Sequence, residues 1–232
     1  MITLHGFASS NYYNVVKHVL LYKDIPFVER LIYGGDDEWL AVSPVGKIPA
    51  LTTEDGRHLS ETVVICDYLE EVYPQQPLYP EDPGDKATVR QIMKVAELYL
   101  ELPSRSMIAY AFSGKEAPEA VKQNARHVTQ RGVGAMNRLC RFSPWIAGED
   151  MTLADIYVHY VNSVVHGIGS RLLQWDIVAE IDGMKQWSRD MRNSDIARRI
   201  EADRVANEPE FTAYIKDYMV KTGRAQGSAE HN

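Results

Sequence analysis

The chain has 232 residues, of which 45% are hydrophobic and 25% charged, and its net charge is −7. This balance is typical of a soluble globular protein, and the acidic excess argues against a nucleic-acid partner, which would require a basic face. No apolar run approaches the roughly 18 residues that span a bilayer, and the first residues lack a signal-peptide pattern. We therefore expect no membrane partner and a cytoplasmic protein.

The first 78 residues alternate between strand and helix patterns. Residues 2–7 form a predicted strand, Ser9 or Ser10 caps a helix that Pro26 ends, and residues 27–33 form a second strand. After a loop, residues 49–53 and 57–59 flank Asp55-Gly56, a hairpin signal, and an apolar helix follows over residues 63–72. The order β-α-β-loop-β-β-α predicts a thioredoxin-like domain over residues 1–78.

The rest of the chain has helical patterns only. Residues 79–85 belong to a proline-rich stretch and read as a linker. Amphipathic stretches then predict an all-helical domain over residues 86–222, and residues 223–232 read as a disordered tail. The predicted helices cover residues 86–113, 116–141, 152–166, 182–203 and 208–221. The fold class is therefore α+β for the first domain and all-α for the second.

Two short segments of the first half carry chemistry. In SPVGKIPAL, residues 43–51, Pro49 opens a strand, and a cis bond before it would leave the backbone of Ile48 free to pair with an extended peptide. In LSETVVICDYLEE, Glu61 and Thr62 stand at a helix N-terminus, which favours a bound carboxylate. Together the two segments predict a site for a small anionic peptide.

A third motif lies in AGEDMTLADIYV of the second half. Thr152 and Asp155 have the spacing of a capping box, with Asp in place of the usual Glu. Each side chain can then satisfy a backbone amide at the start of a helix. We expect Asp155 to stabilise the fold rather than to take part in a reaction.

These three motifs, in this order, together with the first strand and helix, resemble the cytosolic glutathione S-transferases over most of the chain. The resemblance implies that glutathione is the co-substrate and that a small electrophile is the second substrate. It also implies that Ile48, beside cis-Pro49, pairs with the cysteinyl part of glutathione. Glu61 and Thr62 would hold the γ-glutamyl end, and Lys47 would meet the glycyl carboxylate.

Activation of the glutathione thiol requires a hydroxyl or thiol at the first strand–helix junction. That junction reads Ala8-Ser9-Ser10-Asn11-Tyr12 and contains no cysteine. Counting back from Val16-Lys17, Ser10 matches the active serine of the bacterial-like, serine-type members. Ser9, Asn11 and Tyr12 remain alternatives for contact with the thiolate.

The second substrate is predicted to bind between this junction and the first long helix of the second half. The candidate electrophile-site residues are Tyr12, Met107, Ile108, Tyr110 and Ala111. The seven histidines form no metal-ligand pattern, so no metal is expected. The resemblance implies a homodimer and an enzyme of conjugation, peroxide reduction or isomerisation. The alternative is a non-catalytic docking protein on the same fold.

Overall fold

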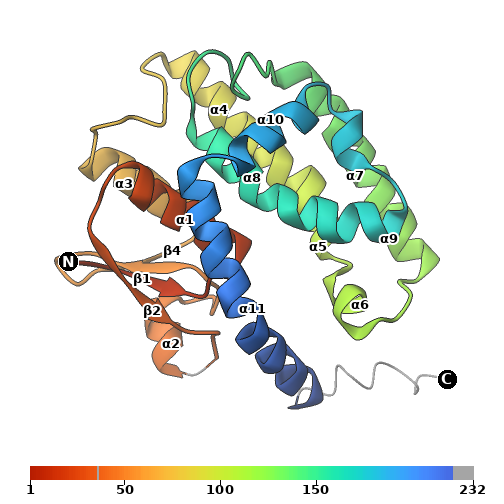
Figure 1. Ribbon diagram of the computed structural model, residues 1–232, viewed down its shortest axis with the longest axis horizontal. Coiled ribbons are helices and arrows are strands. Elements are labelled where there is room, and N and C mark those ends of the chain that lie inside the picture. The colour runs from red at the N-terminus through yellow and green to blue at the C-terminus, as the bar shows by residue number, and fades with distance from the viewer. Residues whose placement is uncertain (36, 222–232) are drawn as a thin grey trace.

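The computed structural model describes residues 1–35 and 37–221, and all of the strands in this part lie in the first half of the chain (Figure 1). They form one sheet in the order β2-β1-β3-β4. β1 is parallel to β2 and antiparallel to β3, and β4 is antiparallel to β3. This mixed sheet confirms the thioredoxin-like prediction. The strands are β1 (Ile2–Gly6), β2 (Phe27–Leu31), β3 (Ala50–Thr52) and β4 (His58–Ser60).

The same half contains one helix that the sequence did not predict. The glycines and acidic residues of 34–38 were expected to be a loop, whereas α2 begins at Asp37. The side chains of Asp37 and Glu38 lie in its first turn, where they oppose the positive end of the helix dipole, and Trp39 is buried. A single buried tryptophan thus anchors a helix too short to show a periodic pattern. The helices of this half are α1 (Asn11–Tyr22), α2 (Asp37–Val42) and α3 (Thr62–Val72).

The core of the molecule runs through α1. Its apolar face, which includes Val15, Val16 and Val19, is fully buried, and α1 packs against both α3 and α8. Near the end of α1, the fully buried ammonium group of Lys23 pairs with Glu70 and donates to the carbonyl of Tyr73 at 2.9 Å. Because that carbonyl lies at the C-terminal end of α3, Lys23 joins the ends of α1 and α3.

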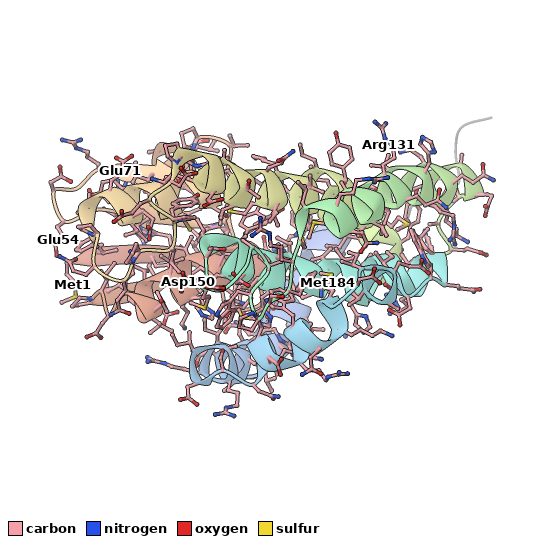
Figure 2. All side chains as sticks on the ribbon, turned by 90° about the horizontal axis from the view of Figure 1, so that it is seen from above. Met1, Glu54, Glu71, Arg131, Asp150 and Met184 are labelled. Atoms are coloured by element: carbon pink, nitrogen blue, oxygen red, sulfur yellow. The ribbon has the colours of Figure 1, made fainter. Side chains whose placement is uncertain are left out.

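From residue 83 to residue 221 the described chain contains helices and no strand, as predicted. Figure 2 shows Met1 and Glu54 at one end of the molecule and Arg131 of the helical part at the other. Within the described residues, no helix is both long and apolar enough to cross a membrane. The helices are α4 (Pro83–Val95), η1 (Ala96–Glu101), α5 (Leu102–Arg105), α6 (Ile108–Ser113), α7 (Glu119–Leu139), α8 (Leu153–Val164), η2 (Val165–Ser170), α9 (Arg171–Leu173), η3 (Ile177–Glu180), α10 (Met184–Arg192) and α11 (Asp195–Lys221).

Three predicted boundaries in this half are wrong. The stretch 86–113 is interrupted by the π-helical segment η1, because Pro103 has no N–H for the regular helical hydrogen bond. The stretch 182–203 is divided at Ser194, whose hydroxyl accepts from the backbone N–H of Ala197 at 3.3 Å and starts α11. The predicted break between residues 203 and 208 is absent, because α11 continues through both residues and through Pro209. The predicted tail, residues 223–232, lies outside the described residues.

The capping box is present at the start of α8. One carboxylate oxygen of Asp155 accepts from the backbone N–H of Thr152 at 2.9 Å. The other accepts from the backbone N–H of Ile146 and from the indole N–H of Trp187, each at 2.8 Å. Asp155 therefore joins a loop, α8 and α10, and its side chain is fully buried.

Candidate active site

The turn between β1 and α1 places Ser10 at the N-terminus of α1. It is closed by a hydrogen bond from the backbone N–H of Ser10 to the carbonyl of Phe7, 3.0 Å long. Ser10 is the N-cap, and its hydroxyl oxygen accepts from the backbone N–H of Tyr13 at 3.4 Å. Because the oxygen is the acceptor in that contact, its O–H can still donate to an anion at the helix N-terminus.

Gly6, the last residue of β1, brings a second part of the predicted site to this turn. Its φ is +150°, a conformation that favours glycine. A Cβ at this position would lie 2.4 Å from the ring of Tyr13 and 2.6 Å from the side chain of Ile48. The absence of a side chain at Gly6 therefore lets Ile48 lie directly against the strand–helix junction.

Ser9 is held differently from Ser10. Its backbone N–H donates to the side-chain oxygen of Asn207 at 3.1 Å, and Asn207 belongs to α11. The side-chain NH2 group of Asn207 donates to the hydroxyl of Tyr33 at 2.8 Å. The hydroxyl oxygen of Ser9 is buried and has no hydrogen-bond partner among the described residues. The last helix is thus joined to the junction through the backbone of Ser9.

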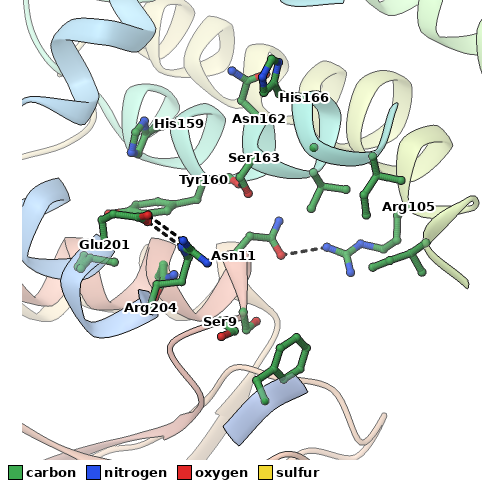
Figure 3. Close-up of a pocket in the computed structure, with 18 of the residues that line it drawn as sticks. Ser9, Asn11, Arg105, His159, Tyr160, Asn162, Ser163, His166, Glu201 and Arg204 are labelled. Atoms are coloured by element: carbon green, nitrogen blue, oxygen red, sulfur yellow. Dashed lines mark hydrogen bonds and ion pairs between the residues drawn. The ribbon is translucent and has the colours of Figure 1, made fainter. Parts of the chain in front are cut away.

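Asn11 is held by α5 (Figure 3). Its side-chain oxygen accepts from the guanidinium of Arg105 at 2.9 Å. Its NH2 group lies 3.5 Å from the carboxylate of Glu101, which is fully buried and also accepts from Arg105 at 2.6 Å. This network fixes the amide of Asn11 and leaves one of its two N–H donors free.

Tyr12 faces the helical half of the molecule. Its ring centroid lies 5.3 Å from the guanidinium carbon of Arg105 and 6.1 Å from the ring of Tyr157. Burial, and then the charge of Glu101, raise the pKa of its hydroxyl well above the usual range. Tyr12 does not line the cavity described below, although it was predicted for the electrophile site.

The Ile48–Pro49 peptide bond is cis, as predicted. Among the described residues, neither the backbone N–H nor the C=O of Ile48 has a hydrogen-bond partner. The carbonyl of the preceding Lys47 accepts from the hydroxyl of Ser43 at 2.7 Å, and the side chain of Lys47 is exposed. The loop is thereby fixed while the backbone of Ile48 remains available to a ligand.

Glu61 and Thr62 lie beside this loop. Ala50 and Ser60 pair across β3 and β4, so Pro49 and Glu61 each lie one residue beyond the same pair. Glu61 is the N-cap of α3 with φ of +70°, and Thr62 is the first residue of that helix. The free backbone N–H groups of this N-terminus can donate to a carboxylate. Glu61 is exposed, whereas Thr62 is buried.

A cavity of about 1370 Å³ opens from the junction. It is bounded by the start of α1, by α5 and α6, by α8 and η2, and by α10 and α11. Ile108, which was predicted for the electrophile site, lines this cavity together with Ala109 and Phe112. Of the other predicted electrophile-site residues, Met107 is fully buried in the core, and Tyr110 and Ala111 lie outside the lining. The reason is that α6 begins afresh at Ile108, which changes the helical phase assumed for one continuous helix.

Four aromatic residues that line the cavity were not predicted from the sequence. Phe7 lies with its ring centroid 4.9 Å from that of Tyr33 and 5.0 Å from that of Phe211. Tyr33 in turn stacks on Tyr214 at 4.6 Å. Phe211 and Tyr214 belong to α11, and no local pattern connects them to residues of the first 35 positions. Only the fold of α11 along α1, visible in Figure 1, brings them together.

The comparisons with known proteins agree with this arrangement. Residues 4–77 match the family model described as glutathione S-transferase, N-terminal domain. A glutathione S-transferase from Pseudomonas putida is 41% identical over 93% of this chain and 98% of its own length. A maleylacetoacetate isomerase from Pseudomonas aeruginosa is 30% identical over 59% of this chain and 66% of its own.

The fold is also shared with solved structures. A glutathione S-transferase from Methylobacterium radiotolerans, solved in complex with glutathione sulfonate, superimposes with a TM-score of 0.71. The match has 19% identity and covers 85% of this chain and 93% of that one. The extent of the similarity to the Pseudomonas putida protein decides the assignment: this chain belongs to the glutathione S-transferase family of enzymes.

Proposed function

We propose that this enzyme binds glutathione, activates its thiol as a thiolate at Ser10, and directs the thiolate at a small electrophile in the adjoining cavity. The observation that carries the proposal is the hydroxyl of Ser10 at the N-terminus of α1, in the lining of the cavity. Its oxygen accepts a helix amide, so its proton is available to the sulfur.

The required stabilisation is modest. A free thiol has a pKa of about 8.5, so only about 3% of it is ionised at pH 7. A decrease of roughly two units would ionise about three quarters of it and corresponds to about 2.7 kcal/mol. A hydrogen bond to a charged group contributes about 1.5–3 kcal/mol, and a helix N-terminus adds about 0.3–1 kcal/mol. Ser10 and the dipole of α1 can together provide this amount.

The glutathione molecule would lie along the loop before β3. In this proposal the unpaired backbone of Ile48, beside cis-Pro49, bonds to the cysteinyl unit. The amides at the start of α3 and the side chains of Glu61 and Thr62 hold the γ-glutamyl end. The exposed ammonium group of Lys47 meets the glycyl carboxylate. The direct contact between Ile48 and Gly6 would keep the sulfur near Ser10.

Conjugation is the first candidate reaction. Isomerisation is the second, because the relative from Pseudomonas aeruginosa is named a maleylacetoacetate isomerase. Both reactions need the same thiolate, and the electrophile would contact Ile108, Ala109 and Phe112. Peroxide reduction would use that thiolate as well, whereas a non-catalytic docking protein would not require it.

We further propose that residues 1–78 and 86–222 act as the glutathione and electrophile domains, with 79–85 as their linker, in a cytoplasmic homodimer. The first domain of one subunit would pack on the helices of the other. Three apolar side chains support this, because Val64 of α3 and Leu98 and Leu102 of the helical half are each more than 40% exposed. Both cysteines of the chain are free thiols, which fits a reducing compartment.

Thiolate formation in single variants tests the proposal. In Ser10→Ala, the pH midpoint of the glutathione thiolate, followed by its absorbance near 240 nm, should rise by a unit or more. Ser10→Thr keeps the hydroxyl and should restore most of the shift. Ser9→Ala and Asn11→Ala are the matched controls at neighbouring positions. The assignment to Ser10 is wrong if one of these controls raises the midpoint and Ser10→Ala does not.

A further inference from the structure

The cavity continues well beyond the region that a thiol and a small electrophile would fill. Its volume of about 1370 Å³ exceeds the roughly 300–1,000 Å³ that is usual for small-molecule pockets. Its lining extends from Ser10 at the junction to residues of α10 and includes Tyr160 and Arg204, which are labelled in Figure 3. The end at α10 has no role in the activation of glutathione.

The lining of the cavity is basic although the chain is acidic. Of the 25 lysines and arginines of the chain, six line the cavity, whereas only two of its 32 aspartates and glutamates do so. Those two carboxylates are already paired, since Asp176 binds Lys185 at 2.9 Å and Glu201 binds Arg204 at 2.8 Å. Arg105 and Arg198 are also paired, with Glu101 and Asp195, which do not belong to the lining. The positive charge that no carboxylate pairs is therefore that of Arg189 and Arg192, and it favours an anionic ligand.

These two arginines of the lining lack an acidic partner. The guanidinium of Arg189 donates to the side-chain oxygen of Gln186 at 2.6 Å, and that of Arg192 donates to the carbonyl of Ser188 at 3.2 Å. Both acceptors are neutral, and neither arginine forms an ion pair with another residue in the described part of the chain. Because they are three positions apart on one helix, the two side chains lie on the same face of α10.

The orientation of that face is fixed by the core. Met184, Trp187 and Met191, on the opposite side of α10, are buried. The indole of Trp187 also donates to the carboxylate of Asp155, so α10 is locked against α8 by the capping box. Packing of α10 therefore places Arg189 and Arg192 at the edge of the cavity, where both side chains are exposed to solvent.

A buried amide at the same end supports a ligand site independently. Asn162 of α8 lines the cavity, is 7% exposed, and has a side-chain oxygen without a hydrogen-bond partner among the described residues. In Figure 3 it lies beside His166, on the side of α8 away from Asn11. Polar atoms buried at this level normally have a partner, so a ligand with a polar group would satisfy it.

From these observations we infer that the cavity binds an elongated organic acid, whose carboxylate lies on Arg189 and Arg192 while its apolar body extends toward Ser10. If the proposed function holds, this acid is the electrophile, and its reacting carbon is the end remote from the carboxylate. Arginine suits such a group because its planar fork can donate two parallel hydrogen bonds to a carboxylate. Ile108 and Phe112 provide the apolar wall near the sulfur.

The test compares an acid with its neutral amide on the glutathione-saturated enzyme by isothermal titration. We expect 6-phenylhexanoate to bind at least tenfold more tightly than 6-phenylhexanamide. In the double variant Arg189→Gln/Arg192→Gln the two should bind within twofold of each other, with the affinity for the amide unchanged. Arg199→Gln removes one positive charge from α11 outside the cavity lining and should keep the preference. Benzoate, which has the carboxylate and the ring without the five-carbon chain, should bind at least tenfold more weakly than the long acid.

The inference is overturned if the wild-type enzyme binds acid and amide equally, if the double variant keeps the preference, or if Arg199→Gln loses it too. Equal affinity for benzoate and 6-phenylhexanoate would overturn the elongated shape of the ligand. The thiolate absorbance of bound glutathione, measured without any acid, separates this test from that of the proposed function. An enzyme without a thiolate but with the acid preference would refute the proposed reaction and leave the binding site standing.

Discussion

Replacement of Asp155 by alanine should strongly destabilise the helical half of the enzyme. The carboxylate accepts from three N–H groups, those of Ile146, Thr152 and the Trp187 indole, at 2.8–2.9 Å. Each would lose its acceptor in a fully buried position, at a cost of about 1–3 kcal/mol. Removal of a buried charge offsets part of this cost, since burial raises the pKa of Asp155 against the lowering effect of its hydrogen bonds. We therefore expect a loss of about 4 kcal/mol in unfolding free energy.

Asp155→Asn should cause a smaller loss of unfolding free energy than Asp155→Ala. An amide oxygen can still accept from Ile146 and Trp187, and the hydroxyl of Thr152 can turn to accept from the new NH2 group. Only the backbone N–H of Thr152 is then left unpaired, so the loss should be about one third of that of the alanine variant, or roughly 1–2 kcal/mol.

Thermal unfolding followed by circular dichroism measures both changes. For a chain of this size, 1 kcal/mol corresponds to about 2–4 °C, so Asp155→Ala should lower the melting temperature by about 8–16 °C. Asp150→Ala, in the exposed loop before α8, is the matched control and should leave it unchanged. Glutathione affinity of the folded variants should stay near normal. The reasoning fails if Asp155→Ala melts like the wild type, or if Asp155→Asn loses as much as Asp155→Ala.

Three further predictions concern buried polar groups. Burial lowers the pKa of His18 to about 3, so the contribution of the neutral imidazole to stability is complete above pH 6.5 and is lost as the pH falls. From pH 7 to pH 5 the unfolding free energy, measured in denaturant titrations, should decrease by about 2 kcal/mol because of His18. His18→Asn should reduce the loss of stability between pH 7 and pH 5 by this amount, while His5 and His159, whose pKa values burial lowers to about 4, keep their share. Lys23→Met should reduce the unfolding free energy by about 3–5 kcal/mol in urea titrations, because it leaves Glu70 buried without its cation; an unchanged midpoint would contradict this. Asn207→Ala should accelerate amide hydrogen exchange at Ser9 by roughly 2- to 12-fold, and full protection in that variant would show that α11 does not hold the junction.

The thioredoxin-like order was predictable because its signals are local. Alternation, caps and the Asp55-Gly56 turn each act within a few residues, and they give the strands and α3 to within a few positions. The elements that were not predicted depend on tertiary contacts. The helix α2 exists because Trp39 is buried, and η1 exists because Pro103 interrupts a helix that is otherwise held by packing.

The candidate site likewise contains residues that local motifs identify and residues that only the tertiary fold brings to it. The positions of Ser10, Ile48 and Glu61 follow from motifs that act over a few residues, and the sequence places them at a turn, a cis bond and a helix N-terminus. Local motifs could not identify the aromatic residues of α11 and the arginines of α10 as part of the cavity. These residues are more than 150 positions from Ser10 in the sequence. Their amphipathic pattern predicts a helix but not the neighbour of its polar face.

The absorbance of the glutathione-saturated enzyme near 240 nm, measured from pH 5 to pH 10, tests the central claim most directly. The proposed site predicts a thiolate midpoint near pH 6.5, about two units below that of free glutathione. A midpoint near 8.5 would show that Ser10 and the N-terminus of α1 do not activate the thiol. Failure of glutathione to bind at all would contradict the proposed seat at Ile48, Glu61 and Thr62 and would favour the non-catalytic docking protein.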